Sequence, residues 1–128
     1  MVEKAVFYTL ENDATFNALV SGRVYPMTSP EGCAFPFCVY NRINADRVQS
    51  LQGSDGLTNY AIQVDHLADT YAEVKSMADA ARQALEAMTG TINTVVVGSC
   101  LITREQDQFN DQANIYRVIQ EFSVWAEE

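Results

Sequence analysis

The sequence contains little positive charge. Eight lysines and arginines stand against 17 aspartates and glutamates, which gives a net charge of −9. Only two of the basic residues are lysines, Lys4 and Lys75, and the basic residues are scattered along the chain without a cluster. Proteins that hold nucleic acid tightly use clustered lysine and arginine to neutralise phosphates. The composition therefore argues against specific nucleic-acid binding.

Long apolar runs are also missing. No run in the sequence approaches the roughly 20 apolar residues that a membrane-spanning helix requires. The first five residues are too polar to begin a secretory signal. We therefore expect a soluble protein that is made in the cytoplasm and does not associate with a membrane.

Residues for catalysis are scarce as well. His66 is the only histidine, and its neighbour Asp65 points to the opposite face of a predicted strand, so the two side chains do not form a dyad. No serine lies in a Gly-x-Ser-x-Gly motif. Gly53 and Gly56 do not form a phosphate-binding loop, because no lysine follows them. These absences predict a protein that is not an enzyme.

Cysteines are few and odd in number: Cys33, Cys38 and Cys100. An odd count gives no closed disulfide framework and is typical of a reducing compartment. The separation of Cys33 and Cys38 is unlike that of compact zinc sites, and nothing in the sequence brings His66 to them. The acidic residues between positions 105 and 111 lack the spacing and the glycine of a calcium-binding loop. We therefore predict buried free thiols, with no metal and no other cofactor.

What remains is the composition of an ordinary globular protein. Hydrophobic residues make up 48% and charged residues 20% of the 128 positions. Both fractions argue against disorder, and the length suits one domain with one core. We therefore expect a single domain over residues 1–128.

Two segments have the periodicity of amphipathic helices. Residues 2–20 carry apolar side chains at helical spacing, with a break where Asp13 is placed as an N-cap. Residues 70–89 begin with a capping box formed by Thr70 and Glu73. The apolar residues of this second helix fall on one arc: Tyr71, Val74, Met77, Ala78, Ala81, Ala84, Leu85 and Met88.

Strand patterns occupy most of the remaining chain. The predicted strands are residues 23–26, 35–43, 57–67, 93–103 and 113–126. Two polar segments between them, residues 44–56 and 104–112, are predicted to be mobile loops. This order of elements implies an α+β fold, with a mostly antiparallel or mixed sheet of about four to five strands and two helices packed on one face.

The last predicted strand has two unlike faces. One face carries residues suited to contact with the helices: Tyr116, Val118, Phe122 and Val124. The opposite face is otherwise polar but contains Ile115, Ile119 and Trp125. We predict that another subunit covers these three side chains. The alternative is that they are scattered exposed apolar residues, which are normal on protein surfaces. Tyr40, in an earlier strand, is a further candidate for the subunit interface.

A series of short motifs runs along nearly the whole chain. In order, the motifs are Gly22–Pro26, Pro30–Gly32, Phe35–Tyr40, Ala61–Asp65, Asp69–Glu73, Arg82–Leu85, Tyr116–Arg117 and Phe122–Trp125. Together they resemble the tail-completion family of long-tailed phages, which has relatives in prophages and gene-transfer particles. The sequence departs from the family pattern at His66-Leu67, where a more aromatic continuation is expected, and at Cys33 and Cys38.

The resemblance implies a virion protein that forms a hexameric ring, caps a finished tail tube, stops its growth and joins the tail to the head. It implies assembly in the host cytoplasm and a final place at the head-proximal end of the tail. The implied partners are further copies of the chain, the tail tube protein and the head–tail connector or stopper protein, while DNA passes through the ring unbound.

The two predicted loops supply candidate residues for docking onto the tube or the connector. These residues are Arg47, Asp55, Arg104, Glu105, Asp107 and Phe109. Two other functions remain open on the sequence alone. One is a head-completion or connector protein on the head side of the joint, and the other is a binding module or small enzyme of the host.

Overall fold

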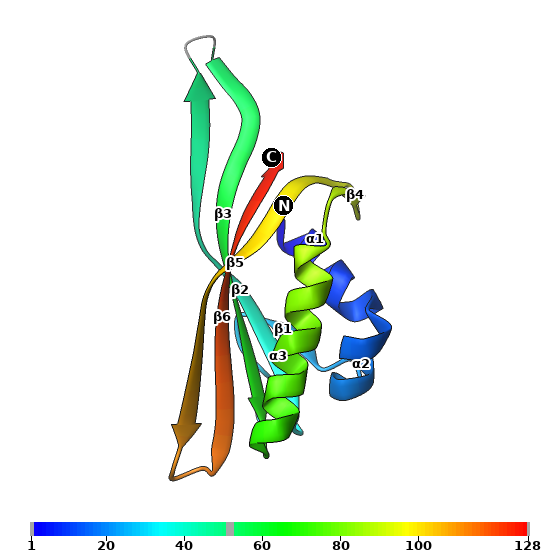
Figure 1. Ribbon diagram of the computed structural model, residues 1–128, viewed down its shortest axis with the longest axis vertical. Helices are drawn as coiled ribbons and strands as arrows, with labels where there is room; N and C mark the ends of the chain where they lie inside the picture. Colours follow the sequence, from blue (N-terminus) through cyan, green and yellow to red (C-terminus); the bar gives the residue numbers. More distant parts are fainter. Residues whose placement is uncertain (1, 51–52, 128) are drawn as a thin grey trace.

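Three helices and six strands form within the described part of a computed structural model, residues 2–50 and 53–127, in which the side chains of residues 47–57 are not described (Figure 1). The helices are α1 (Val2–Asn12), α2 (Ala14–Val20) and α3 (Tyr71–Glu86). The strands are β1 (Val24–Pro26), β2 (Phe37–Ser50), β3 (Gly53–Ala68), β4 (Gly90–Ile92), β5 (Val95–Asn110) and β6 (Ile115–Glu127). No helix in these residues is long and apolar enough to cross a membrane.

The strands join one mixed sheet in the order β1-β2-β3-β6-β5-β4. β1 runs parallel to β2, and the other neighbouring pairs are antiparallel. Figure 1 shows the helices on one side of this sheet, with α3 lying along it. The predicted single-domain α+β class is confirmed. Across the described residues, however, the counts are six strands and three helices, because the break at Asp13 separates α1 from α2 and because β4 was not expected.

The helix starts follow from local capping. The carboxylate of Asp13 accepts a hydrogen bond from the backbone N–H of Phe16 at 3.2 Å, and the hydroxyl of Thr70 accepts one from the N–H of Glu73 at 3.2 Å. Each bond satisfies a donor that the first turn of a helix leaves unpaired. Both predicted N-caps are therefore confirmed. The predicted apolar arc of this helix is buried apart from Ala84, which is partly buried, and Tyr71, which lies half-exposed at the first turn.

The two predicted loops are wrong. Residues 44–50 belong to β2, residues 53–56 belong to β3, and residues 104–110 belong to β5. Both segments form antiparallel hairpins, and Figure 1 shows the hairpins at opposite ends of the sheet. The sequence did not predict these hairpins because their residues are polar. Strands that pack against few other side chains are stabilised mainly by backbone hydrogen bonds, which leave no apolar pattern in the sequence.

The core lies between the helices and one face of the sheet. Alternate residues of the two central strands supply that face: Tyr60, Ile62 and Val64 from β3, and Val118, Phe122 and Val124 from β6. They pack with the buried residues of the helices in one cluster. The opposite face of the sheet carries no helix in the described residues, so this face remains available for contacts outside the subunit.

Candidate assembly surface

The helix-free face of the sheet carries the apolar residues that the alternation of β6 predicted. Ile119 lies opposite Asp65, and Trp125 lies opposite Asn59, both on the face away from the core. Trp125 is 37% exposed, whereas Ile115 and Ile119 are half-buried. The alternation therefore assigned these side chains to the correct face.

Leu101 is a strongly exposed apolar residue of this face that the sequence pattern did not single out. Its side chain is 62% exposed, and it lies opposite Ser123, two positions along the strand from the pairing of Ser99 with Trp125. We call Leu101 and Trp125 the apolar pair. Bulges on both sides of Leu101, between Val97 and Ser99 and between Ile102 and Arg104, break the alternation of β5 that would have assigned its face.

An ion pair crosses the same face near its middle. The Arg117 guanidinium of β6 donates a hydrogen bond to the carboxylate of Asp65 on β3. Asp65 is largely buried, whereas the Arg117 side chain is 38% exposed. Because Asp65 is held on this face and His66 points into the core, the structure confirms that the two neighbours point to opposite faces.

Tyr40 is not on the helix-free face. Its side chain is 7% exposed, lies in the core and packs against Phe7 of α1 with ring centroids 6.0 Å apart. The residue follows the alternation of β2, in which Cys38 and Tyr40 both point toward the helices. A buried side chain offers little surface to another subunit. We therefore remove Tyr40 from the candidates for the subunit interface.

Two of the predicted docking residues make contacts within the subunit: Asp107 joins β5 to α3, and Phe109 packs against β6. The Tyr71 hydroxyl of α3 donates to the carboxylate of Asp107 at 2.8 Å, and the Lys75 ammonium lies 3.3 Å from the same carboxylate. Phe109 stacks on Tyr116, with ring centroids 4.7 Å apart. The hydrogen bond from Tyr71 lowers the pKa of Asp107 and raises that of Tyr71.

The remaining docking candidates fall in three different places. Arg104 lies opposite Glu121 and donates to the side chain of Gln106, so it belongs to the helix-free side. Glu105 points the other way and accepts a hydrogen bond from Gln120 at 2.9 Å. Arg47 and Asp55 lie on the β2–β3 hairpin, and their side chains are outside the described part of the structure. The six residues therefore do not form one surface.

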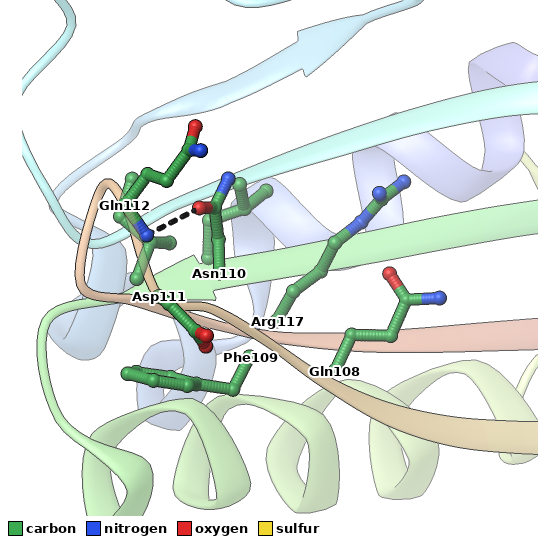
Figure 2. A pocket seen from close by; sticks show the side chains of 8 residues that line it. Gln108, Phe109, Asn110, Asp111, Gln112 and Arg117 are labelled. Carbon is green, nitrogen blue, oxygen red and sulfur yellow. Dashed lines mark hydrogen bonds between the residues drawn. The ribbon is translucent and has the colours of Figure 1, made fainter.

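A hollow of about 530 Å³ lies beside the end of the β5–β6 hairpin (Figure 2). Its lining mixes polar and apolar side chains, with Gln108, Asn110, Asp111, Gln112 and Arg117 joined by Leu67, Phe109 and Ile115. The side chain of Asn110 accepts hydrogen bonds from the backbone N–H groups of the turn, one of which is drawn in Figure 2. This turn holds the hairpin end in a defined shape.

A polar network is buried beneath the other face. The side-chain amide of Gln120 donates to the carbonyl of Ala78 on α3 and to the carboxylate of Glu105, both at 2.9 Å. Its oxygen therefore faces His66, whose Nε2–H donates to it at 2.8 Å. His66 is fully buried, with Phe16 packed edge-on against its ring. Burial lowers the pKa of His66 to about 4, although the hydrogen bond that His66 donates to Gln120 opposes the shift, so the imidazole is neutral at pH 7.

The three thiols are free and lie apart. Cys38 and Cys100 are buried as predicted, and burial raises the pKa of Cys100 to about 12. Cys33 differs, since it is only half-buried and its thiol lies 3.5 Å from the Tyr25 hydroxyl. Among the described residues, no group of three or more histidine, cysteine or acidic side chains is arranged to hold a metal ion.

Comparison with known proteins identifies the family. The family model described as tail completion protein gp17 matches residues 4–127 of this chain. The chain belongs to this family. It is a structural protein of the phage tail, and its place is in the virion. The sequence resemblance is therefore confirmed at the level of the family and of the tail-completion role.

One solved structure is similar to this chain in fold. A chain of the virion of a native gene transfer agent particle matches with a TM-score of 0.82 at 19% sequence identity. The match covers 96% of the tail-completion chain and 92% of the other chain. No curated protein matches the sequence. At this identity the structural likeness establishes the fold alone.

Proposed function

We propose that this tail-completion protein is a tail terminator. Its copies assemble into a hexameric ring that caps the tail tube, stops further polymerisation and joins the tail to the head. The ring sits at the head-proximal end of the tail, catalyses no reaction and requires no cofactor. Family membership supports this proposal, and the observation that carries it beyond the family is the apolar pair on the helix-free face of the sheet.

The apolar pair favours association between copies. Leu101 and Trp125 are exposed on neighbouring strands of a single subunit, with the partly buried Ile119 further along the same face. Exposed apolar side chains gathered on one face are typical of a surface that a partner covers. In the ring, we expect that partner to be a second copy of the chain.

The charge of the protein suits a ring through which DNA passes. A net charge of −9 on each copy repels the phosphate backbone, and four of the eight basic side chains are held in ion pairs. Arg42, Lys75, Arg82 and Arg117 lie in ion pairs with acidic residues of the same subunit. We therefore expect the wall of the ring to attract DNA only weakly.

Light scattering tests the proposal, with and without purified tail tubes. The wild-type protein is expected to form hexamers, alone or at tube ends, and to stop the extension of the tubes. Leu101→Asp is expected to remain folded, because the side chain is 62% exposed, but to lose assembly. Tyr8→Asp is the matched control, since Tyr8 is a comparably exposed apolar residue on α1.

Three results would count against this proposal. Rings of Leu101→Asp that form at the wild-type concentration would remove the apolar pair from the argument. Binding to isolated heads instead of tube ends would assign the chain to the head side of the joint. A protein that remains a monomer with tubes and with heads would overturn assembly altogether.

A further inference from the structure

The two long outer strands of the sheet are only partly covered by the short strands beside them. β1 pairs with β2 only at Cys38–Tyr40, and β4 pairs with β5 only at Val95–Val97. Within the described residues, no strand pairs with the outer edge of β2 from Asn41 onward or with that of β5 from Gly98 onward. Each subunit therefore has two unpaired strand edges, one on each side of the sheet.

We propose that neighbouring copies in the ring join by strand pairing, with the β2 edge of one copy, residues 41–46, beside the β5 edge of the next, residues 99–104. This inference rests on the proposed ring and names the contact that builds it. An unpaired strand edge is a template for another strand, because its N–H and C=O groups point outward without partners.

The directions of the strands fit this junction. β2, β3, β6 and β5 are neighbours in this order, and each runs antiparallel to the one before it. β2 and β5 therefore run in opposite directions. When copies are related by rotation about a ring axis, the next β2 lies antiparallel to β5 and continues the alternation. Two different edges that meet in this way give a head-to-tail interface, which is the kind that closes into rings.

The free segments also lie at the same level of the sheet. Asn41 pairs with Gln63, which pairs with Glu121, which pairs with Arg104. At the other end, Asp46 pairs with Asn59, and Asn59 lies level with Ser99 through Trp125. Residues 41–46 and 99–104 therefore span the same rows of the sheet, although they lie on opposite edges.

Exposed apolar side chains mark both edges at this level. Leu101 of β5 is 62% exposed, and Ile43 of β2, at a bulge between Arg42 and Asn44, is 46% exposed. Arg42 points toward the helices, where its guanidinium lies over the Tyr60 ring, and Asn44 lies opposite Ala61, so Ile43 is the unpaired residue of the bulge between them. Pairing of the two edges brings the side chains of Leu101 and Ile43 together.

Glu86 occupies the β5 edge in the free subunit. Its carboxylate, at the end of α3, accepts a hydrogen bond from the backbone N–H of Ile102 at 3.2 Å. This N–H lies in the middle of the proposed junction, so an incoming strand has to displace Glu86. Glu86 thus hinders strand pairing at this edge in the free subunit. Natural proteins often place charged side chains at exposed strand edges for this purpose.

Hydrogen–deuterium exchange on the full-length protein tests the junction. In assembled rings, the amides of residues 41–46 and 99–104 are expected to exchange more slowly than in the monomer, whereas those of α1 are expected to be unchanged. Rings that assemble without this protection would overturn the junction and leave the terminator intact. Failure to form rings with tubes present would overturn both.

A pair of variants tests whether Glu86 hinders pairing at the β5 edge. Glu86→Ala frees the N–H of Ile102, and we expect assembly at about fivefold lower protein concentration, the change expected from losing one competing hydrogen bond. Asp79→Ala removes an exposed acid from the same helix and is expected to assemble like the wild type. Thermal unfolding of both monomers checks that the fold is kept. Equal assembly of Glu86→Ala and Asp79→Ala would refute the role of Glu86 in hindering strand pairing.

Discussion

The buried His66 makes the stability of the fold depend on pH. Burial lowers the pKa of His66 from 6.5 to about 4. The unfolded chain therefore takes up a proton at a higher pH than the folded chain does. The contribution to folding stability is fully present above pH 6.5 and is lost as the pH falls toward 4. Asp65 and Glu105, the nearby acids, raise the pKa and moderate this loss, but burial outweighs them.

The size of the effect follows from the two pKa values. The lowered pKa corresponds to about 3 kcal/mol of unfolding free energy once both states are protonated. At pH 5, where the unfolded state is largely protonated and the folded state is not, the expected loss is about 2 kcal/mol. This loss is a large part of the roughly 5–15 kcal/mol that stabilises a typical domain, so denaturation experiments measure it easily.

Urea denaturation at pH 7 and pH 5 measures this loss, with His66→Gln as the comparison. The variant amide can still donate to Gln120 but does not titrate, so the contribution of the carboxylates cancels between the two proteins. We expect the wild type to lose about 2 kcal/mol more than the variant. Since the chain has a single histidine, NMR follows its imidazole directly and should show no titration between pH 7 and pH 5 in the folded protein. An equal loss in both proteins, or an imidazole that titrates near 6.5, would refute the reasoning.

Two further predictions concern the core and a helix cap. Phe122→Ala is expected to lower the unfolding free energy by about 3–5 kcal/mol, because the ring is fully buried between β6 and the helices, and chemical denaturation measures the change. Thr70→Ala is expected to cost about 1 kcal/mol through the lost N-cap of α3, whereas Thr70→Ser, which keeps the hydroxyl, should stay close to the wild type in thermal unfolding. A loss below 1 kcal/mol for Phe122→Ala, or equal losses for the two Thr70 variants, would contradict these packing and capping arguments.

The elements that the sequence predicted well are those with a local cause. Asp13 and Thr70 each begin a helix by accepting a hydrogen bond from a residue three positions later, so the signal and its effect lie in the same turn. The alternation of β6 likewise assigned Val118 and Phe122 to the core and Ile119 to the opposite face. The family motifs were also readable along the chain, because they are local in sequence.

The hairpins and the assembly surface depended on contacts between distant segments. Residues 104–110 read as a loop because their own pattern is polar, yet pairing with β6 makes them a strand. Gln120 interrupts the apolar face of β6, and only the structure shows that it is satisfied there by Ala78, Glu105 and His66. Such contacts carry no periodic signal, because their partners lie far away in the chain.

The sequence alone determined that the chain is an acidic α+β protein of the tail-completion family, since composition, helix caps and motifs are properties of consecutive residues. The tertiary structure decided which side chains face outward. It buried Tyr40 and exposed Leu101, and in the described residues it left β2 from Asn41 onward and β5 from Gly98 onward with no strand paired to the outer edge. The physical reason is that burial depends on strand register and on which face the helices cover, and both are settled only when distant segments pack together.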